Sequence, residues 1–381
     1  MEHKPGINTY VNYLEKNAVD PIDYVMGLFE QNNIVVLGER LHHEMSQWEF
    51  IYKLTSDPRF IKNVGNIFTE YGSVSQQPEL EAFLASESFD EKALIHIMRG
   101  FPVWPDGWPN KNFHDFLARL RELNKGLDTD SKIHLLFSDI PRDWEKITRE
   151  EFEASYPVIM VRDEFMASRI LLKFIEILKS PEKRKKALVV MNYRHAFSKE
   201  LLAGQHNTAA YLMENLQHKR VTNVMLNTVS ITPSPDGSAK LLQSGKWDAA
   251  FAVLGNKPMG FSFQDSPFGR DHFDYWDYTP HKFGYKDIFE GMIFYSPVSE
   301  MTLANTYPGY YDKEFKDIFN KRAALYTGAK FRVLPKELAE IIESRKDLDN
   351  KIANTDWEPK HLQYDPAPMR QWLIEEPPTE K

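Results

Sequence analysis

The sequence predicts an α/β fold with a mainly parallel sheet flanked by helices and a helical insertion after the second strand. Four short apolar runs end in polar or ionisable residues, as buried parallel strands do where they open into loops. They begin near residues 34, 67, 133 and 188. Segments with helical spacing alternate with these runs, and this alternation is typical of a parallel sheet.

The first strand is expected at residues 34–37, an apolar and largely β-branched run that stops at Gly38. Near-helical spacing of apolar residues from Met45 to Leu54 then predicts a helix, which ends before the break at Asp57-Pro58. The order here is strand, loop and helix. We therefore expect the loop between them to carry reactive side chains.

The connection between the second and third strands, from Gln76 to Ser131, is longer than most connections within one sheet. We expect two helices in it, at residues 80–98 and 113–123, on either side of a proline-rich segment. We interpret the connection as a helical insertion over the sheet edge that could act as a lid. Alternatively, Trp104 and Trp108 pack a large loop against the core.

The rest of the chain continues the alternation. The 3.6-residue period predicts a helix over residues 161–178, followed by a strand at 187–191, a helix at 208–217, and strands at 224–229 and 292–295. We therefore divide the chain into an N-terminal helical segment (1–30), an α/β domain (31–300) with its insertion at about 76–131, and a helical and irregular extension packed on the core (301–381).

Composition excludes several classes of function. The net charge of −8 has no long blocks of one sign, which argues against nucleic acid as a partner. No apolar stretch approaches the ~20 residues of a membrane span, so we expect a soluble protein, either cytoplasmic or exported with its signal removed. The absence of cysteine excludes disulfides, thiolate ligands and a cysteine nucleophile. The oligomeric state stays open.

Ionisable residues follow the predicted strands. If these strands are parallel, their carboxyl ends meet at one edge of the sheet, where open α/β sheets place their ligands. We therefore expect a cluster there, made of Glu39, His42, Glu70, Asp139 and His195.

Glu39 and His42 are three residues apart, so they share one face if the loop turns into a helix. A carboxylate beside an imidazole fixes its tautomer and raises its basicity, as a general base requires. Alternatively, they are solvated side chains at a capped helix start. The cluster supports either metal-free water activation or a metal site with nitrogen and oxygen ligands. Because no His-Glu-x-x-His motif is present, we expect no metal.

Arg162 and Asp163 open the most regular predicted helix. The forked donors of Arg162 could bind an anionic substrate or an oxyanion, or the two residues could form a surface pair. Arg194 has the same two interpretations. His134 lies inside an apolar strand and is expected to be a core residue. No Gly-x-Ser-x-Gly elbow and no glycine-rich phosphate loop is present, which disfavours the usual serine hydrolases and nucleotide chemistry.

The segment Leu37-Gly38-Glu39-Arg40-Leu41-His42 resembles the Gly-Glu-x-x-His loop of the erythromycin esterase-like family. Further segments resemble that family in order, at residues 67–70, 137–139, 162–167 and 189–195. The resemblance implies a parallel α/β core and an esterase in which His42 is the general base on water, supported by Glu39 and Glu70. Two departures are His43, where the family commonly has glycine, and residues 192–196, where it has His-Asn-x-His.

From these observations we expect a metal-independent hydrolase of an ester or lactone with a small-molecule substrate and no cofactor. The alternative is a non-enzymatic protein of the same superfamily that binds haem or a metal. The catalytic residues are expected to be His42, Glu39, Glu70 and His195, and the substrate-binding residues Arg162, Arg194, Asp139, His43 and Asp163.

Overall fold

The computed structural model describes residues 6–200, 206–216, 220–276, 282–304, 306–327 and 358–375. The chain divides into two compact units. Unit 1 comprises residues 1–65, 183–303 and 360–381, and unit 2 comprises residues 66–182 and 304–359. Parallel strands and flanking helices alternate along the chain, so the predicted α/β fold class is confirmed.

Five strands of unit 1 lie in the order β4-β1-β5-β7-β6. The first four are parallel, and β6 is antiparallel to β7. Every residue of β1, β4 and β5 is buried, which explains why these strands appear in the sequence as continuous apolar runs. Their bounds are β1 Ile34–Glu39, β4 Ala187–Asn192, β5 Val221–Leu226, β6 Met259–Ser262 and β7 Gly291–Phe294.

The register of β1 and β4 positions the site. Ile34 pairs with Ala187 at the amino ends of these strands, and Glu39 pairs with Asn192 at their carboxyl ends. Both terminal residues therefore lie at the same edge of the sheet, where the chain leaves each strand for a loop or a helix.

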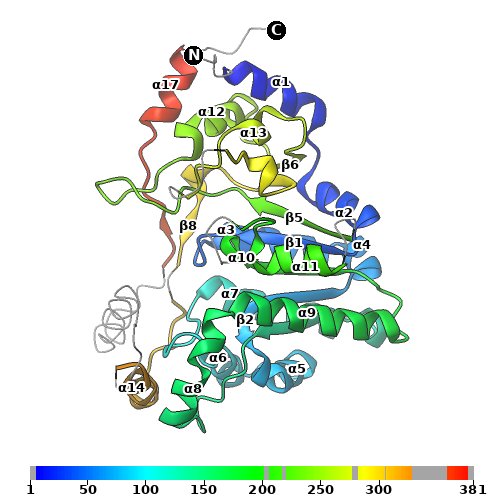
Figure 1. Ribbon diagram of the computed structural model, residues 1–381, viewed down its shortest axis with the longest axis vertical. Helices are drawn as coiled ribbons and strands as arrows, with labels where there is room; N and C mark the ends of the chain where they lie inside the picture. The colour runs from blue at the N-terminus through cyan, green and yellow to red at the C-terminus, as the bar shows by residue number, and fades with distance from the viewer. Residues whose placement is uncertain are drawn as a thin grey trace. The chain divides into compact units, whose positions relative to one another are not determined.

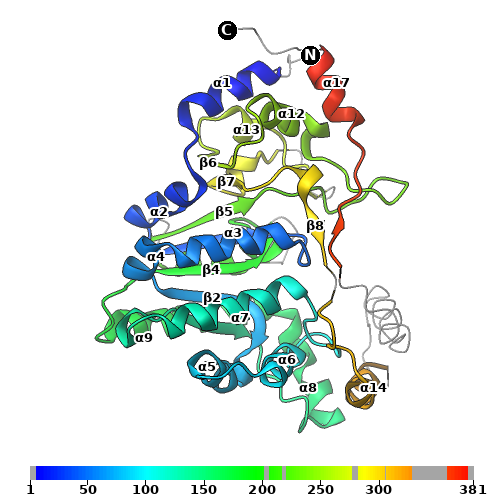
Figure 2. The same cartoon turned by 180° about the vertical axis from the view of Figure 1, so that it is seen from behind.

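Helices cover both faces of this sheet. Figure 1 shows α11 in front of the strands, and Figure 2, from behind, shows α3 in front of them. Near the C-terminus, α17 packs beside α12, and two short strands, β8 Thr302–Leu303 and β9 Lys360–His361, pair. The α-helices in the part of unit 1 that the structure describes are α1 Ile7–Asn17, α2 Pro21–Gln31, α3 Met45–Ser56, α4 Pro58–Asn63, α10 Tyr193–Ala196, α11 Thr208–Leu216, α12 Lys246–Val253, α13 Pro267–Arg270 and α17 Ala367–Glu375.

Unit 2 contains the parallel pair β2 Asn66–Ser73 and β3 His134–Asp139. Three helices lie between these strands in the chain, so the predicted helical insertion after the second strand is confirmed: α5 Gln77–Ala85, α6 Glu91–Arg99 and α7 Lys111–Lys125. The other helices among the described residues of unit 2 are α8 Arg149–Met160, α9 Arg162–Lys179, which packs on β3, and α14 Lys313–Thr327. Trp108 is buried against Tyr71 and Phe101, as the packing interpretation of the insertion expects.

Some predicted elements differ from the structure. The helix expected at 80–98 is two helices, because Asp90 caps a new start by accepting hydrogen bonds from the Lys92 and Ala93 amides. The strand expected at 224–229 lies at 221–226. The expectation that His134 is a core residue is wrong. It is the first residue of β3, its side chain is half exposed, and its Nε2 atom lies 3.7 Å from Oε2 of Glu182.

Candidate active site

The predicted site residues fall in both units. All but one are at or just beyond the carboxyl end of a strand, or at a helix start. The exception is Glu70, which lies inside β2, because this strand continues to Ser73. Unit 1 holds Glu39, His42, His43, Arg194 and His195, and unit 2 holds Glu70, Asp139, Arg162 and Asp163.

Glu39 and His42 are in direct contact. Glu39 is the last residue of β1, and its Oε1 atom forms a hydrogen bond with Nδ1 of His42 in the following loop. The carboxylate is fully buried, whereas a quarter of the His42 side chain is exposed. The pair therefore has a buried orienting end and an accessible imidazole.

Asn192 contacts the other ring nitrogen of His42. Its Nδ2 atom lies 2.8 Å from Nε2 of His42. The orientation of the Asn192 side-chain amide follows from a second hydrogen bond. The Arg194 backbone N–H donates to Oδ1 of Asn192 at 2.9 Å, so the Nδ2 atom is the one that faces the imidazole. Asn192 is then the donor and Nε2 the acceptor, so the proton of the neutral ring is on Nδ1, facing Glu39.

Gln47, in the first turn of α3, holds Glu39 and its loop. Its Nε2 atom donates to Oε2 of Glu39 at 3.1 Å and to the Leu41 carbonyl at 2.5 Å, and its Oε1 accepts from the Arg40 backbone N–H at 3.2 Å. Gln47 is completely buried. The carboxylate that faces His42 is therefore fixed by a side chain whose own amide is bonded at both ends.

Glu44 closes the same loop. It caps α3 by accepting from the backbone N–H groups of Ser46 and Gln47, and it also accepts from the Tyr295 hydroxyl at 2.9 Å. Burial raises the pKa of Glu44, and these hydrogen bonds oppose the shift. The loop that carries His42 is thus tied to α3 and to the end of β7.

The other predicted residues of unit 1 differ in exposure. Burial, with the charges of His42 and Arg40, lowers the pKa of His43 to about 4, so this imidazole is neutral at neutral pH. His195 is buried in the one-turn helix α10, whereas Arg194 in the same turn is exposed. Arg194 contributes to the site through its backbone, which orients Asn192.

In unit 2, Arg162 joins two carboxylates. Its Nε donates to Oδ1 of Asp139 at 2.8 Å, and its Nη2 donates to Oδ2 of Asp139 at 2.7 Å and to Oε2 of Glu70 at 3.0 Å. Burial works against its charge, but the two carboxylates outweigh burial and raise the pKa of Arg162. Burial also raises the pKa of Asp139, which is fully enclosed. The interpretation of Arg162 and Asp163 as a surface pair is therefore wrong, because the guanidinium of Arg162 donates to Asp139 and Glu70.

Sequence reasoning did not select Asn192, Gln47 or Glu44 for the site. The position of Asn192 directly after an apolar run is the same signal that selected Glu39, so it could have been found. Gln47 and Glu44 have no such signal, since their roles depend on how the loop closes onto α3.

Within the described residues, no three histidine, aspartate or glutamate side chains are grouped as metal ligands would be. Among the same residues, no helix is long and apolar enough to cross a membrane. The predictions about metal and cofactor stay predictions.

Comparisons with known proteins concern the fold. No family model matches the chain, and no curated protein matches its sequence. The structure is similar to that of a succinoglycan biosynthesis protein, with 9% identity, a TM-score of 0.50, and coverage of 74% of this chain and 95% of the other. At such identity the similarity shows the fold alone.

Two further solved structures are also similar. One is a protein from Bacillus cereus, with 12% identity, coverage of 76% of this chain and 97% of the other, and a TM-score of 0.49. The other is a mutant of an erythromycin esterase, with 10% identity, coverage of 71% of this chain and 92% of the other, and a TM-score of 0.44.

Proposed function

We propose that this protein is a hydrolase of the erythromycin esterase-like type, which cleaves an ester or lactone with water activated by His42. The observation that carries the proposal is the array of Glu39, His42 and Asn192 at the carboxyl ends of β1 and β4. The sequence resemblance of this loop to the family's Gly-Glu-x-x-His motif supports the same assignment.

The array suits a general base. With the proton on Nδ1, the Nε2 lone pair is the basic site, and Glu39 stabilises the imidazolium that forms when Nε2 takes a proton from water. In the resting state Asn192 donates to this lone pair. An incoming water must therefore replace the amide hydrogen bond before it can donate its own proton to Nε2.

The other roles expected from the sequence stay part of this proposal. Glu70 and His195 are proposed as catalytic residues, and substrate binding is proposed for Arg162, Arg194, Asp139, His43 and Asp163. Arg162 is already bonded to two carboxylates, so an oxyanion would share its guanidinium with them.

The proposal is tested by hydrolysis of a panel of aryl esters, lactones and macrolides, with acid release measured for wild type and for Glu39→Gln. Glu314→Gln, an exposed change of the same kind in α14, is the matched control. We expect turnover of at least one ester by wild type and by the control, and its loss in Glu39→Gln. No turnover of any ester would contradict the proposal. Bound haem or metal in the same inactive preparation would favour the binding alternative.

A further inference from the structure

A cleft lies in unit 1, at the opposite edge of the sheet from His42. This cleft of about 710 Å³ is lined by Asn33 and Lys186, the residues directly before β1 and β4. Because β1 has six residues at about 3.3 Å each, roughly 20 Å of strand separates Asn33 in the cleft from Glu39. The cleft is therefore distinct from the candidate active site.

Cationic side chains predominate in the cleft. Five of them line it: Arg59, Lys62, Lys183, Lys185 and Lys186. Two carboxylates, Asp23 and Glu30, line it as well. Arg59 is paired with Asp23 at 2.6 Å and with Asp57 outside the lining at 2.9 Å, so the excess of positive charge comes from the four lysines. The whole chain has a net charge of −8, so this lining is a local positive region on an acidic protein.

The backbone of the basic segment is held in place at three points. Arg184, between the lining lysines, is buried, and its Nη1 donates to the Ile61 carbonyl at 3.3 Å. Asn33 donates to the Lys185 carbonyl at 3.0 Å, and the Ala187 amide donates to the Asn33 carbonyl at 2.8 Å. The lysines on either side of Arg184 are thus presented from a fixed backbone, which lowers the cost of gathering them around a ligand.

Gly65 allows this arrangement. It has a φ of +64°, and a Cβ atom there would lie 2.1 Å from Nη1 of Arg184. A side chain at residue 65 would therefore displace the buried guanidinium that anchors the basic segment.

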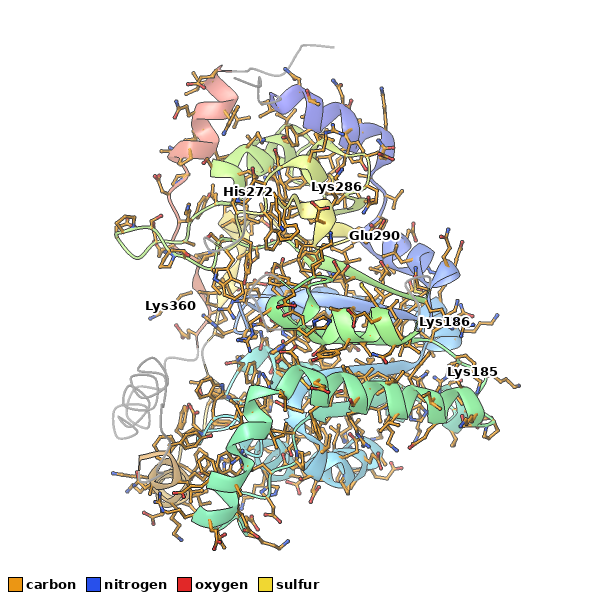
Figure 3. All side chains as sticks on the ribbon, in the orientation of Figure 1. Lys185, Lys186, His272, Lys286, Glu290 and Lys360 are labelled. Carbon is orange, nitrogen blue, oxygen red and sulfur yellow. The ribbon has the colours of Figure 1, made fainter. Side chains whose placement is uncertain are left out.

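Figure 3 labels Lys185 and Lys186 where the chain enters β4, and Lys286 and Glu290 beside β7, at a different cleft of the same unit.

We propose that this cleft binds a compact anion that carries several phosphate groups. Lysine ammonium groups are strongly hydrated point charges that suit phosphate oxygens, and a volume of about 710 Å³ is in the range of small-molecule sites. A compact ligand is favoured over nucleic acid or an anionic membrane, because an extended polyanion would also meet the surface of a protein with net charge −8. This site is independent of the proposed hydrolase.

The test uses inorganic tripolyphosphate as the probe, with binding to the full chain measured by calorimetry at ionic strength of about 0.15 M, where screening is strong. The test variant is Lys62→Glu/Lys183→Glu, two exposed residues of the cleft. The matched control, Lys199→Glu/Lys286→Glu, makes the same change of charge in the cleft of about 770 Å³ at the amino ends of β5 and β7.

We expect saturable binding to wild type and to the control, and a loss of affinity of about tenfold or more in Lys62→Glu/Lys183→Glu. Thermal unfolding should be the same for all three proteins, since the changed residues are at the surface. The proposal is overturned if wild type does not bind tripolyphosphate, or if both variants weaken equally. It is also overturned if a single-stranded oligonucleotide or phosphatidylserine vesicles bind this cleft more tightly than tripolyphosphate.

Discussion

The Nδ2 atom of Asn192 lies 2.8 Å from Nε2 of His42, across the ends of two neighbouring parallel strands. Since Glu39 occupies the other ring nitrogen, the imidazole is bonded on both sides and its tautomer follows from its partners. A neutral amide at Nε2 holds the ring without adding a charge.

Replacing Asn192 by aspartate should lower kcat/KM for the best ester about 100-fold at neutral pH. The carboxylate would accept a hydrogen bond from a protonated Nε2, whereas the amide donates a hydrogen bond to the unprotonated Nε2, so the lone pair needed for water activation would be lost. Asn192→Ser, which retains a donor, should lose much less. The measurement is kcat/KM against pH for the three proteins. Equal profiles for wild type and Asn192→Asp would contradict this role of Asn192.

Gln47→Leu should lower the free energy of unfolding by about 1–3 kcal/mol, because it removes the hydrogen bonds that Gln47 makes to the buried Oε2 of Glu39 and to the Arg40 backbone amide. The rate of hydrolysis should fall with it, since Glu39 would no longer be held toward His42. Urea denaturation and ester turnover measure the two effects. Gln31→Leu, an exposed change at the end of α2, is the control and should alter neither.

Arg162→Met should lower the free energy of unfolding by about 3–5 kcal/mol, because it leaves Asp139 and Glu70 buried without their cation. Adding Asp139→Asn to Arg162→Met should restore part of the loss, since one of the unpaired charges is removed. Urea denaturation of the single and double variants measures this coupling. A double variant with the summed loss of the two single variants would show that the ion pair is not the cause.

Stability should fall as the pH is lowered from 6.5 toward 4, because His43 binds a proton only in the unfolded chain across this range. The pKa of His43 is lower in the folded protein than in the unfolded chain. The stability that this difference provides is therefore complete above the unfolded pKa and is lost as the pH falls toward the folded pKa. At pH 5 the loss should be about 2 kcal/mol relative to neutral pH. Comparison of urea denaturation at the two pH values should show a smaller loss for His43→Gln. An equal loss in both proteins would assign the effect to other groups.

Much of the fold could be predicted because strands buried on both faces form continuous apolar runs, and β1, β3 and β4 were located in this way. The helix break before α6 was missed. Apolar residues continue at compatible spacing from Leu80 to Met98, and the break depends on a local cap at Asp90.

The site could be predicted in part. The contact between Glu39 and His42 follows from a separation of three residues, which the sequence displays directly. The contact of Asn192 with His42 depends on the register of β1 against β4. The hydrogen bonds of the Arg162 guanidinium to Asp139 and Glu70 depend on the pairing of β2 with β3. The contacts of Asn192 with His42 and of Arg162 with Glu70 join residues 150 and 92 positions apart in the chain, and a single sequence does not show them.

The role of His42 as general base is best tested by measuring kcat/KM for the best ester of the panel with wild type, His42→Ala and His134→Ala. His134 is a half-exposed histidine at the start of β3 and serves as the matched control. We expect a loss of about 10²- to 10⁴-fold in His42→Ala, with its thermal unfolding retained and the control at the wild-type rate. Full activity in His42→Ala would contradict the role of His42 as general base.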